Sequence, residues 1–166
     1  LFEENVMDGM LPYILAGVLA AIAVAVAVAW KPVTARLRAR EVKQAIGLFR
    51  LQREQLEAKF FDLASMQGKP RGLRWMDCDW QNGVTFARDV HSKMLTAFVA
   101  VNITFEALEG SDMEEVEAVG TIREAAAVFH YSRKRWGTGG RPLFNMNAED
   151  AVVRLQGQFE AVSADA

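Results

Sequence analysis

The stretch "MLPYILAGVLAAIAVAVAVAWKP" at residues 10–32 contains 20 consecutive uncharged residues, from Leu11 to Trp30. At ~1.5 Å rise per residue, a helix of this length crosses the ~30 Å hydrocarbon core of a bilayer. A secretory signal carries a basic segment before a shorter apolar run, whereas residues 1–10 hold three acids and no base. Tyr13 and Trp30 lie near the two ends, where aromatic rings favour the headgroup layer. We therefore expect a transmembrane helix over 11–30 rather than a cleaved signal or a buried core helix.

The charges that follow this segment predict its orientation. Between residues 31 and 43 there are five basic residues and a single acid, Glu41. The five are Lys31, Arg36, Arg38, Arg40 and Lys43. Because positive residues stay on the cytoplasmic side, we expect a single-pass inner (cytoplasmic) membrane protein with its N-terminus outside and its C-terminal domain in the cytoplasm. The same cations are expected at the membrane surface, so the lipid bilayer is the first expected partner.

Small residues recur along the apolar segment at Gly17, Ala21 and Ala25. This spacing places them on one helix face, where another membrane helix can approach closely. It predicts intramembrane packing against other membrane protein subunits. The alternative is that a segment so rich in alanine acquires this spacing by chance.

The residues after the apolar segment are numerous enough for one domain with its own core. They contain all 19 basic residues and all but three of the 21 acidic residues, so this part is close to neutral and we expect no nucleic-acid partner. Charge is nevertheless segregated, since residues 31–53 hold seven bases and one acid, and residues 109–117 hold five acids and no base. A single cysteine, Cys78, excludes an internal disulfide and fits a reducing compartment.

A long amphipathic helix is predicted as far as Met66, with Pro32 either ending the first helix or starting this one. Its apolar residues recur at three- and four-residue steps, and Arg53 interrupts them. They are Val42, Ile46, Phe49, Leu56, Phe60 and Leu63. We expect this stripe to pack on the helix's own domain. The alternative is that it forms a coiled-coil seam with a second copy of the chain, so a homodimer is also possible.

Strands are predicted after a turn at residues 67–72. Asn82-Gly83, within 73–89, is the favoured dipeptide of a two-residue hairpin turn, and it would place Asp77 opposite Arg88 as an ion pair. After a turn at residues 91–93, alternation over 94–108 predicts a half-buried strand.

Two further strands and a helix are predicted towards the C-terminus. A long strand is expected over 116–131, bent near residues 120–124, although 123–127 alone would suit a helix. A glycine-rich strand over 136–146 follows, and Asn147 is expected to cap a closing helix that continues as far as Phe159.

This element order predicts an α+β fold, in which an antiparallel sheet of about five strands wraps the long helix. The predicted regions are 1–10, a short acidic segment; 11–30, the transmembrane helix; 31–66, the basic juxtamembrane stalk and long amphipathic helix; and 67–166, the sheet and closing helix, which form one domain with the end of the long helix.

By element order over residues 40–160, the chain resembles cystatin-like and NTF2-like rolls. The segments GLRWMDCDW and RPLFNMNAEDAV resemble those of uncharacterised bacterial single-pass membrane proteins. Neither resemblance implies a role for any residue.

No residue pattern in the chain identifies a reaction. Asp77, Cys78 and Asp79 cannot converge on a metal because alternate strand residues face opposite sides. Cys78 and His130 would form a nucleophilic pair only if the fold brought them together. We therefore expect no catalytic residues, no metal site and no cofactor.

Two sets of residues are candidate binding surfaces. Three cations beside an indole, Arg133, Lys134, Arg135 and Trp136, suit an acidic partner or a membrane surface. Trp75, Phe86, Phe105 and Phe129 would line a pocket between sheet and helix, if one exists. The expected function is a non-catalytic accessory subunit that serves as a membrane-tethered interaction module. A roll domain that binds a lipid or small molecule, as a sensor or enzyme, is the alternative.

Overall fold

The computed structural model describes residues 4–67 and 72–163. The chain divides into two compact units, Leu1–Glu41 and Val42–Ala166, and helix α1 (Glu4–Gln67) contributes to both. Residues 1–3 of the predicted acidic segment and residues 68–71 of the predicted turn lie outside the described residues.

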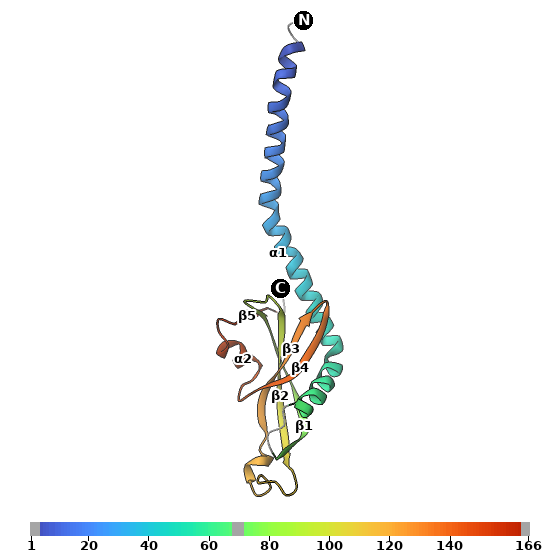
Figure 1. Ribbon diagram of the computed structural model, residues 1–166, viewed down its shortest axis with the longest axis vertical. Helices are drawn as coiled ribbons and strands as arrows, with labels where there is room; N and C mark the ends of the chain where they lie inside the picture. Colours follow the sequence, from blue (N-terminus) through green and yellow to red (C-terminus); the bar gives the residue numbers. More distant parts are fainter. Residues whose placement is uncertain (1–3, 68–71, 164–166) are drawn as a thin grey trace. The chain divides into compact units, whose positions relative to one another are not determined.

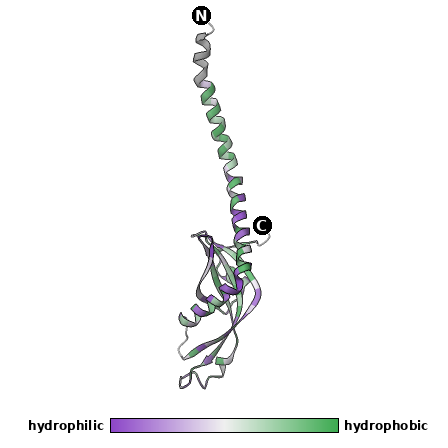
Figure 2. Ribbon diagram, turned by 90° about the vertical axis from the view of Figure 1, so that its right-hand side faces the viewer, coloured by the Kyte–Doolittle hydropathy of each residue, from purple (hydrophilic) through white to green (hydrophobic). Residues whose placement is uncertain are grey.

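The first unit is helical throughout its described part. The apolar stretch is the continuous green run of Figure 2, followed by a hydrophilic segment, and its described side chains are exposed. It is long and apolar enough to cross a membrane. The expected boundary at Pro32 is not observed, because the helix continues through it. Thr34 Oγ1 lies 2.9 Å from the carbonyl oxygen of Trp30 and 3.0 Å from that of Lys31. The threonine hydroxyl is therefore a local hydrogen-bond donor for the backbone carbonyls beside the proline.

The second unit contains a five-stranded antiparallel sheet in the order β4-β3-β2-β1-β5 (Figure 1). The elements are β1 (Leu73–Asp89), β2 (Leu95–Ala107), the 3₁₀ helix η1 (Glu117–Gly120), β3 (Arg123–Ser132), β4 (Arg135–Phe144), α2 (Ala148–Arg154) and β5 (Phe159–Val162). An α+β fold with a curled sheet and a long helix is therefore confirmed.

The core of the second unit lies between one face of the sheet and the C-terminal part of α1. Five of the six predicted stripe residues, Val42, Ile46, Phe49, Leu56 and Phe60, are buried there, and Leu63 is half-buried. On β2, the alternate residues Val99, Val101 and Ile103 face the helix. The prediction that the stripe packs on its own domain is confirmed. A smaller cluster on the other face of the sheet includes Phe98, Ala148 and Ala151, which brings α2 against that face (Figure 1).

The predicted hairpin at Asn82-Gly83 is wrong, because β1 is one continuous strand. Trp80 pairs with Val101 and Val84 with Val99, so three residues of β1, 81–83, lie opposite one residue of β2. The turn dipeptide forms a bulge rather than a reversal. Asp77 then pairs with Thr104, and Arg88 with Leu95, so the expected pairing of Asp77 with Arg88 is wrong as well.

The C-terminal predictions are confirmed in part. The expected strand over 116–131 is divided into η1 and β3, and residues 123–127 are strand rather than helix. Asn147 caps α2 as expected, since its Oδ1 accepts from Glu149 N at 3.0 Å and Asp150 N at 2.8 Å. The helix ends at Arg154, and Phe159 begins the unexpected strand β5 against β1. Gly157, with φ of +87°, lies in the turn between them.

Candidate interaction surfaces

The strand register gives the sheet two distinct ends. One, the turn end, carries the β1–β2 turn (residues 90–94) and the β3–β4 turn (residues 133–134), because Leu95 pairs with Tyr131. The other, the loop end, carries the β2–β3 connection (residues 108–122). Helix α1 enters the second unit at the turn end, where the Trp136 indole Nε1 donates to the carbonyl oxygen of Ala45 at 2.7 Å. The 13 residues of β2 separate the two ends by about 40 Å along the strand.

Four exposed cations gather at the turn end, and we call them the cationic cluster. They are Lys93, Arg133, Lys134 and Arg135. Trp136, which the sequence grouped with the last three, is instead 7% exposed, and its ring lies 4.9 Å from that of Phe49 between centroids. The indole therefore belongs to the core, because it points to the helix face of the sheet. The exposed surface at the turn end consists of the cationic cluster without Trp136.

Asp89, the last residue of β1, is the acid that adjoins the β1–β2 turn. Its Oδ1 accepts hydrogen bonds from Ser92 N at 2.7 Å and His91 N at 2.8 Å. These bonds, with that from Ser92 foremost, lower the pKa of the Asp89 carboxyl. The carboxylate is thus engaged in closing the turn, beside the cations.

The loop end contains an apolar cavity of about 310 Å³. Its apolar lining consists of Leu73, Phe105, Met113, Val116, Val119 and Phe144. Arg123 and Asn145 add polar groups to the lining. The β2–β3 connection contributes Met113, Val116 and Val119 to the lining, and its Ser111 hydroxyl donates to the carbonyl oxygen of Gly72, the residue before β1, at 3.2 Å.

Exposed apolar and acidic side chains lie on the β2–β3 connection, three residues of which line this cavity, and at Phe144 on β4. The apolar ones are Leu108, Val116, Ile122 and Phe144, of which Ile122 is 59% exposed. The acids are Glu109, Asp112, Glu114 and Glu115. We call this set the loop-end surface. Leu108, Val116 and Ile122 belong to the same connection as the acids, whereas Phe144 comes from β4 and only the fold brings it to the cavity.

The four expected pocket residues occupy different places. Phe86 and Phe129 each lie 5.6 Å from Phe49 between ring centroids, so they fill the space between sheet and helix. Trp75 is also buried and lies 5.2 Å from Phe105 between ring centroids. Of the four, Phe105 lines the loop-end cavity.

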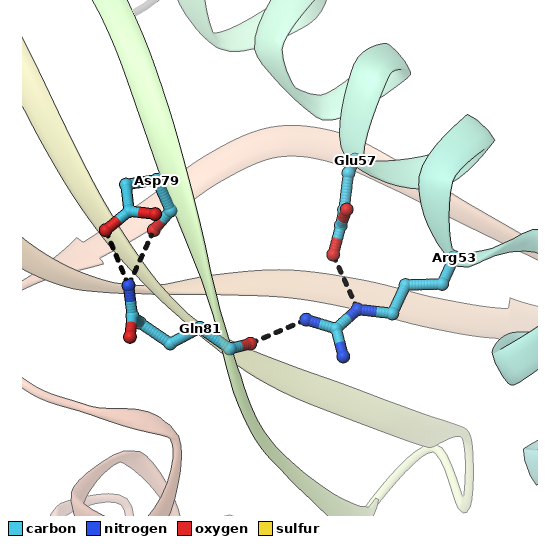
Figure 3. Close-up of polar contacts among 4 residues, drawn as sticks. All are labelled: Arg53, Glu57, Asp79 and Gln81. Atoms are coloured by element: carbon cyan, nitrogen blue, oxygen red, sulfur yellow. Dashed lines mark hydrogen bonds and ion pairs between the residues drawn. The ribbon is translucent and has the colours of Figure 1, made fainter.

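A polar contact joins α1 to the bulge in β1 (Figure 3). Arg53 Nη2 donates to the carbonyl oxygen of Gln81 at 2.5 Å, and Arg53 Nε donates to Glu57 Oε1 at 2.6 Å. The Gln81 amide in turn donates to Asp79 Oδ2 at 2.7 Å. Arg53, the residue that breaks the apolar stripe, therefore satisfies a carbonyl that the bulge removes from the strand ladder.

The residues considered for chemistry lie apart. Cys78 is buried on the helix side of the sheet, and this burial raises the pKa of its thiol to about 12. His130 pairs with Thr96 in the register, whereas Cys78 pairs with Ile103, seven positions further along β2. The fold therefore does not bring Cys78 and His130 together. Within the described residues, no group of three or more His, Cys, Asp or Glu side chains could hold a metal ion.

The residues expected at or in the membrane are exposed on α1. They are the five cations Lys31, Arg36, Arg38, Arg40 and Lys43, and the small residues Gly17, Ala21 and Ala25. The small-residue face is open to a partner helix: a Cβ added at Gly17 would meet nothing within 4 Å.

No protein-family model matches the chain, and neither the curated proteins nor the solved structures contain a match.

Proposed function

We propose that this chain is a membrane-anchored, non-catalytic accessory subunit whose loop-end surface binds a partner subunit of a larger membrane protein complex. The observation that carries the proposal is the exposure of Val116 and Phe144 at one cavity, with Leu108 and Ile122 exposed at the two ends of the loop that contributes to its lining. Exposed apolar surface with a polar rim is typical of protein interaction sites. The acids Glu109, Asp112, Glu114 and Glu115 supply such a rim.

The chemistry of this surface defines the expected partner segment. An apolar side chain would enter the cavity, and Lys or Arg residues beside it would meet the acidic rim. The charged rim would favour fast association and select against acidic surfaces, whereas the apolar contacts would supply most of the affinity.

The anchor in this proposal is the apolar part of α1, which is long enough to span a bilayer. The basic residues from Lys31 to Lys43 favour a cytoplasmic location for the domain. Gly17, Ala21 and Ala25 offer a second contact with the complex inside the membrane.

The test is extraction of the full chain from native membranes in a mild detergent, followed by sizing and identification of the proteins that remain bound. We expect a stoichiometric assembly that Ile122→Gln weakens and that Leu51→Gln leaves intact. Leu51 is the matched control, because it is a large aliphatic residue, 85% exposed, on α1. An assembly equally tolerant of both substitutions would remove the loop-end surface from the proposal, and a lone monomer would refute the accessory-subunit function.

The cavity itself favours a second candidate, a binding site for a lipid or small molecule. Its volume of about 310 Å³ is at the lower limit for ligand pockets, and its lining combines apolar side chains with Arg123 and Asn145. Native mass spectrometry of the extracted chain distinguishes the two candidates. A bound small molecule that Val119→Trp displaces, without any protein partner, would favour the second.

A further inference from the structure

The backbone of the two turns at the turn end is unusual. Lys93, Arg133 and Lys134 have φ values of 59°, 51° and 60°, in the left-handed region that glycine and asparagine occupy most readily. Arg133 and Lys134 are the two central residues of the β3–β4 turn, since Ser132 pairs with Arg135. Positive φ at both central positions is the pattern of a type I′ turn, for which Asn-Gly is preferred.

The strained positions and the charges coincide. All three non-glycine residues with positive φ at the turn end are cations, and each has an exposed side chain. Stability alone would favour asparagine or glycine there, so the turns carry cations at the expense of local backbone preference. With Arg135, they present four positive charges at one end of the sheet, beside the already hydrogen-bonded carboxylate of Asp89.

Chain connectivity restricts what this end can face. Only 12 residue steps join Trp30, at the end of the apolar segment, to Val42, the first residue of the second unit. Even a fully extended connection of that length spans at most about 40 Å. Because α1 enters the domain beside Trp136, this connection keeps the cations of the adjoining turns within reach of the surface of any membrane that the apolar segment crosses.

We propose that the cationic cluster docks the turn end of the domain on anionic lipid headgroups. This proposal rests on the membrane anchor of the proposed function. The guanidinium groups of Arg133 and Arg135 and the ammonium groups of Lys93 and Lys134 meet lipid phosphates and carboxylates at the leaflet surface. The acidic loop-end surface lies at the far end of the strands, so docking directs it away from the like-charged headgroups and towards a partner.

The turn chemistry supplies a variant that removes charge without weakening the fold. Arg133→Asn with Lys134→Gly installs the preferred type I′ dipeptide and deletes two cations. We expect this variant to unfold at the same or a higher temperature than the parent. The matched control, Lys59→Gln with Arg141→Gln, deletes two exposed cations elsewhere in the same unit.

The experiment uses the full chain in nanodiscs of phosphatidylcholine, with or without 30% phosphatidylserine. A donor dye on Ser92→Cys, in the exposed β1–β2 turn, reports energy transfer to an acceptor on the lipid headgroups. The same dye on Asp112→Cys reports the loop end. Cys78 is buried and stays unlabelled in the folded chain.

We expect phosphatidylserine to raise energy transfer from residue 92 and not from residue 112. The double substitution at 133 and 134 should lower the ratio of docked to undocked domain about 30-fold, and raising the KCl concentration to 0.5 M should also lower it. The control variant should behave as the parent does.

Equal transfer with and without phosphatidylserine would overturn the docking proposal, as would a double variant that matches its parent; either result would direct the search towards an acidic protein partner. Flotation with vesicles tests the anchor separately. If the chain floats but its energy transfer does not depend on phosphatidylserine, the docking alone is refuted. If the chain fails to float, the anchor and the docking are refuted together.

Discussion

Gly140 is the position where the fold should be least tolerant of one added methyl group. It lies on β4 with φ of +66°, and a Cβ built there would lie 2.6 Å from both Ala64 N and Leu63 Cβ. These atoms belong to the backbone and first side-chain carbon of α1, so rotation of a flexible side chain cannot relieve the clash. Gly140→Ala therefore forces β4 away from the helix.

The magnitude follows from three contributions. Left-handed backbone costs an alanine about 1–2 kcal/mol, and overpacking costs about 1–3 kcal/mol. Reduced freedom of the unfolded chain offsets about 0.4–1 kcal/mol. We expect Gly140→Ala to lower the free energy of unfolding by about 2–4 kcal/mol.

Urea denaturation of the full chain in detergent micelles, followed by tryptophan fluorescence, measures this change. Trp136 is a suitable reporter, since it is buried between the sheet and α1. Gly139→Ala is the control, because a Cβ at Gly139 meets nothing within 4 Å and its φ is not in the left-handed region. The reasoning is refuted if Gly140→Ala costs less than about 1 kcal/mol or no more than the control.

Four further outcomes are expected. Arg53→Met should lower the free energy of unfolding by about 1.5–3 kcal/mol, because it leaves the Gln81 carbonyl without its charged donor. Arg50→Met, on the exposed face of the same helix, is the control and should cost little in the same urea titration. Equal costs for the two substitutions would contradict this prediction. Burial lowers the pKa of His130 from its ordinary 6.5, so as the pH drops the imidazole is protonated in the unfolded chain before it is protonated in the folded chain. The free energy of unfolding should therefore fall as the pH drops through about 6.5. His130→Gln should reduce that slope in denaturation curves at pH 7.5 and 5.5, and an unchanged slope would assign it to other groups. Because its pKa is raised to about 12, Cys78 should have about a thousandth of the thiolate fraction of an ordinary cysteine at pH 8. Maleimide should therefore label it only when the chain unfolds. Rapid labelling of the native chain would show that the thiol is accessible to solvent. Ala21→Leu should weaken association in detergent, measured by sizing, if the small-residue face is used, and an unchanged assembly would remove that face from consideration.

The parts of the fold that the sequence predicted are those set by periodicity and capping. Alternation over 94–108 identified β2 within one residue at each end, because every second side chain faces the same helix. The α1 stripe was predicted for the equivalent reason. Asn147 was recognised as a cap because its side chain satisfies backbone N–H groups two and three residues away.

The surfaces were harder to predict, because each depends on contacts between distant segments. The acids of residues 109–117 are visible in the sequence, but the position of Phe144 beside them follows from the pairing of Ala125 with Phe144. The sequence groups Trp136 with the neighbouring cations, whereas its burial and its hydrogen bond to Ala45, 91 residues earlier, show that it is a core residue. The strain at Arg133 and Lys134 is a backbone property that their residue types argue against.

Two local anomalies in the sequence turn out to be one feature of the structure. Arg53 is a charged residue within an apolar stripe, and Asn82-Gly83 is a turn dipeptide within a strand; each alone argues against the element that contains it. The bulge at residues 81–83 displaces the Gln81 carbonyl from the ladder, and Arg53 from the facing helix donates to it at 2.5 Å (Figure 3). Because the two anomalies lie 28 residues apart, local propensity predicts a hairpin, whereas the helix–sheet contact favours a single bulged strand.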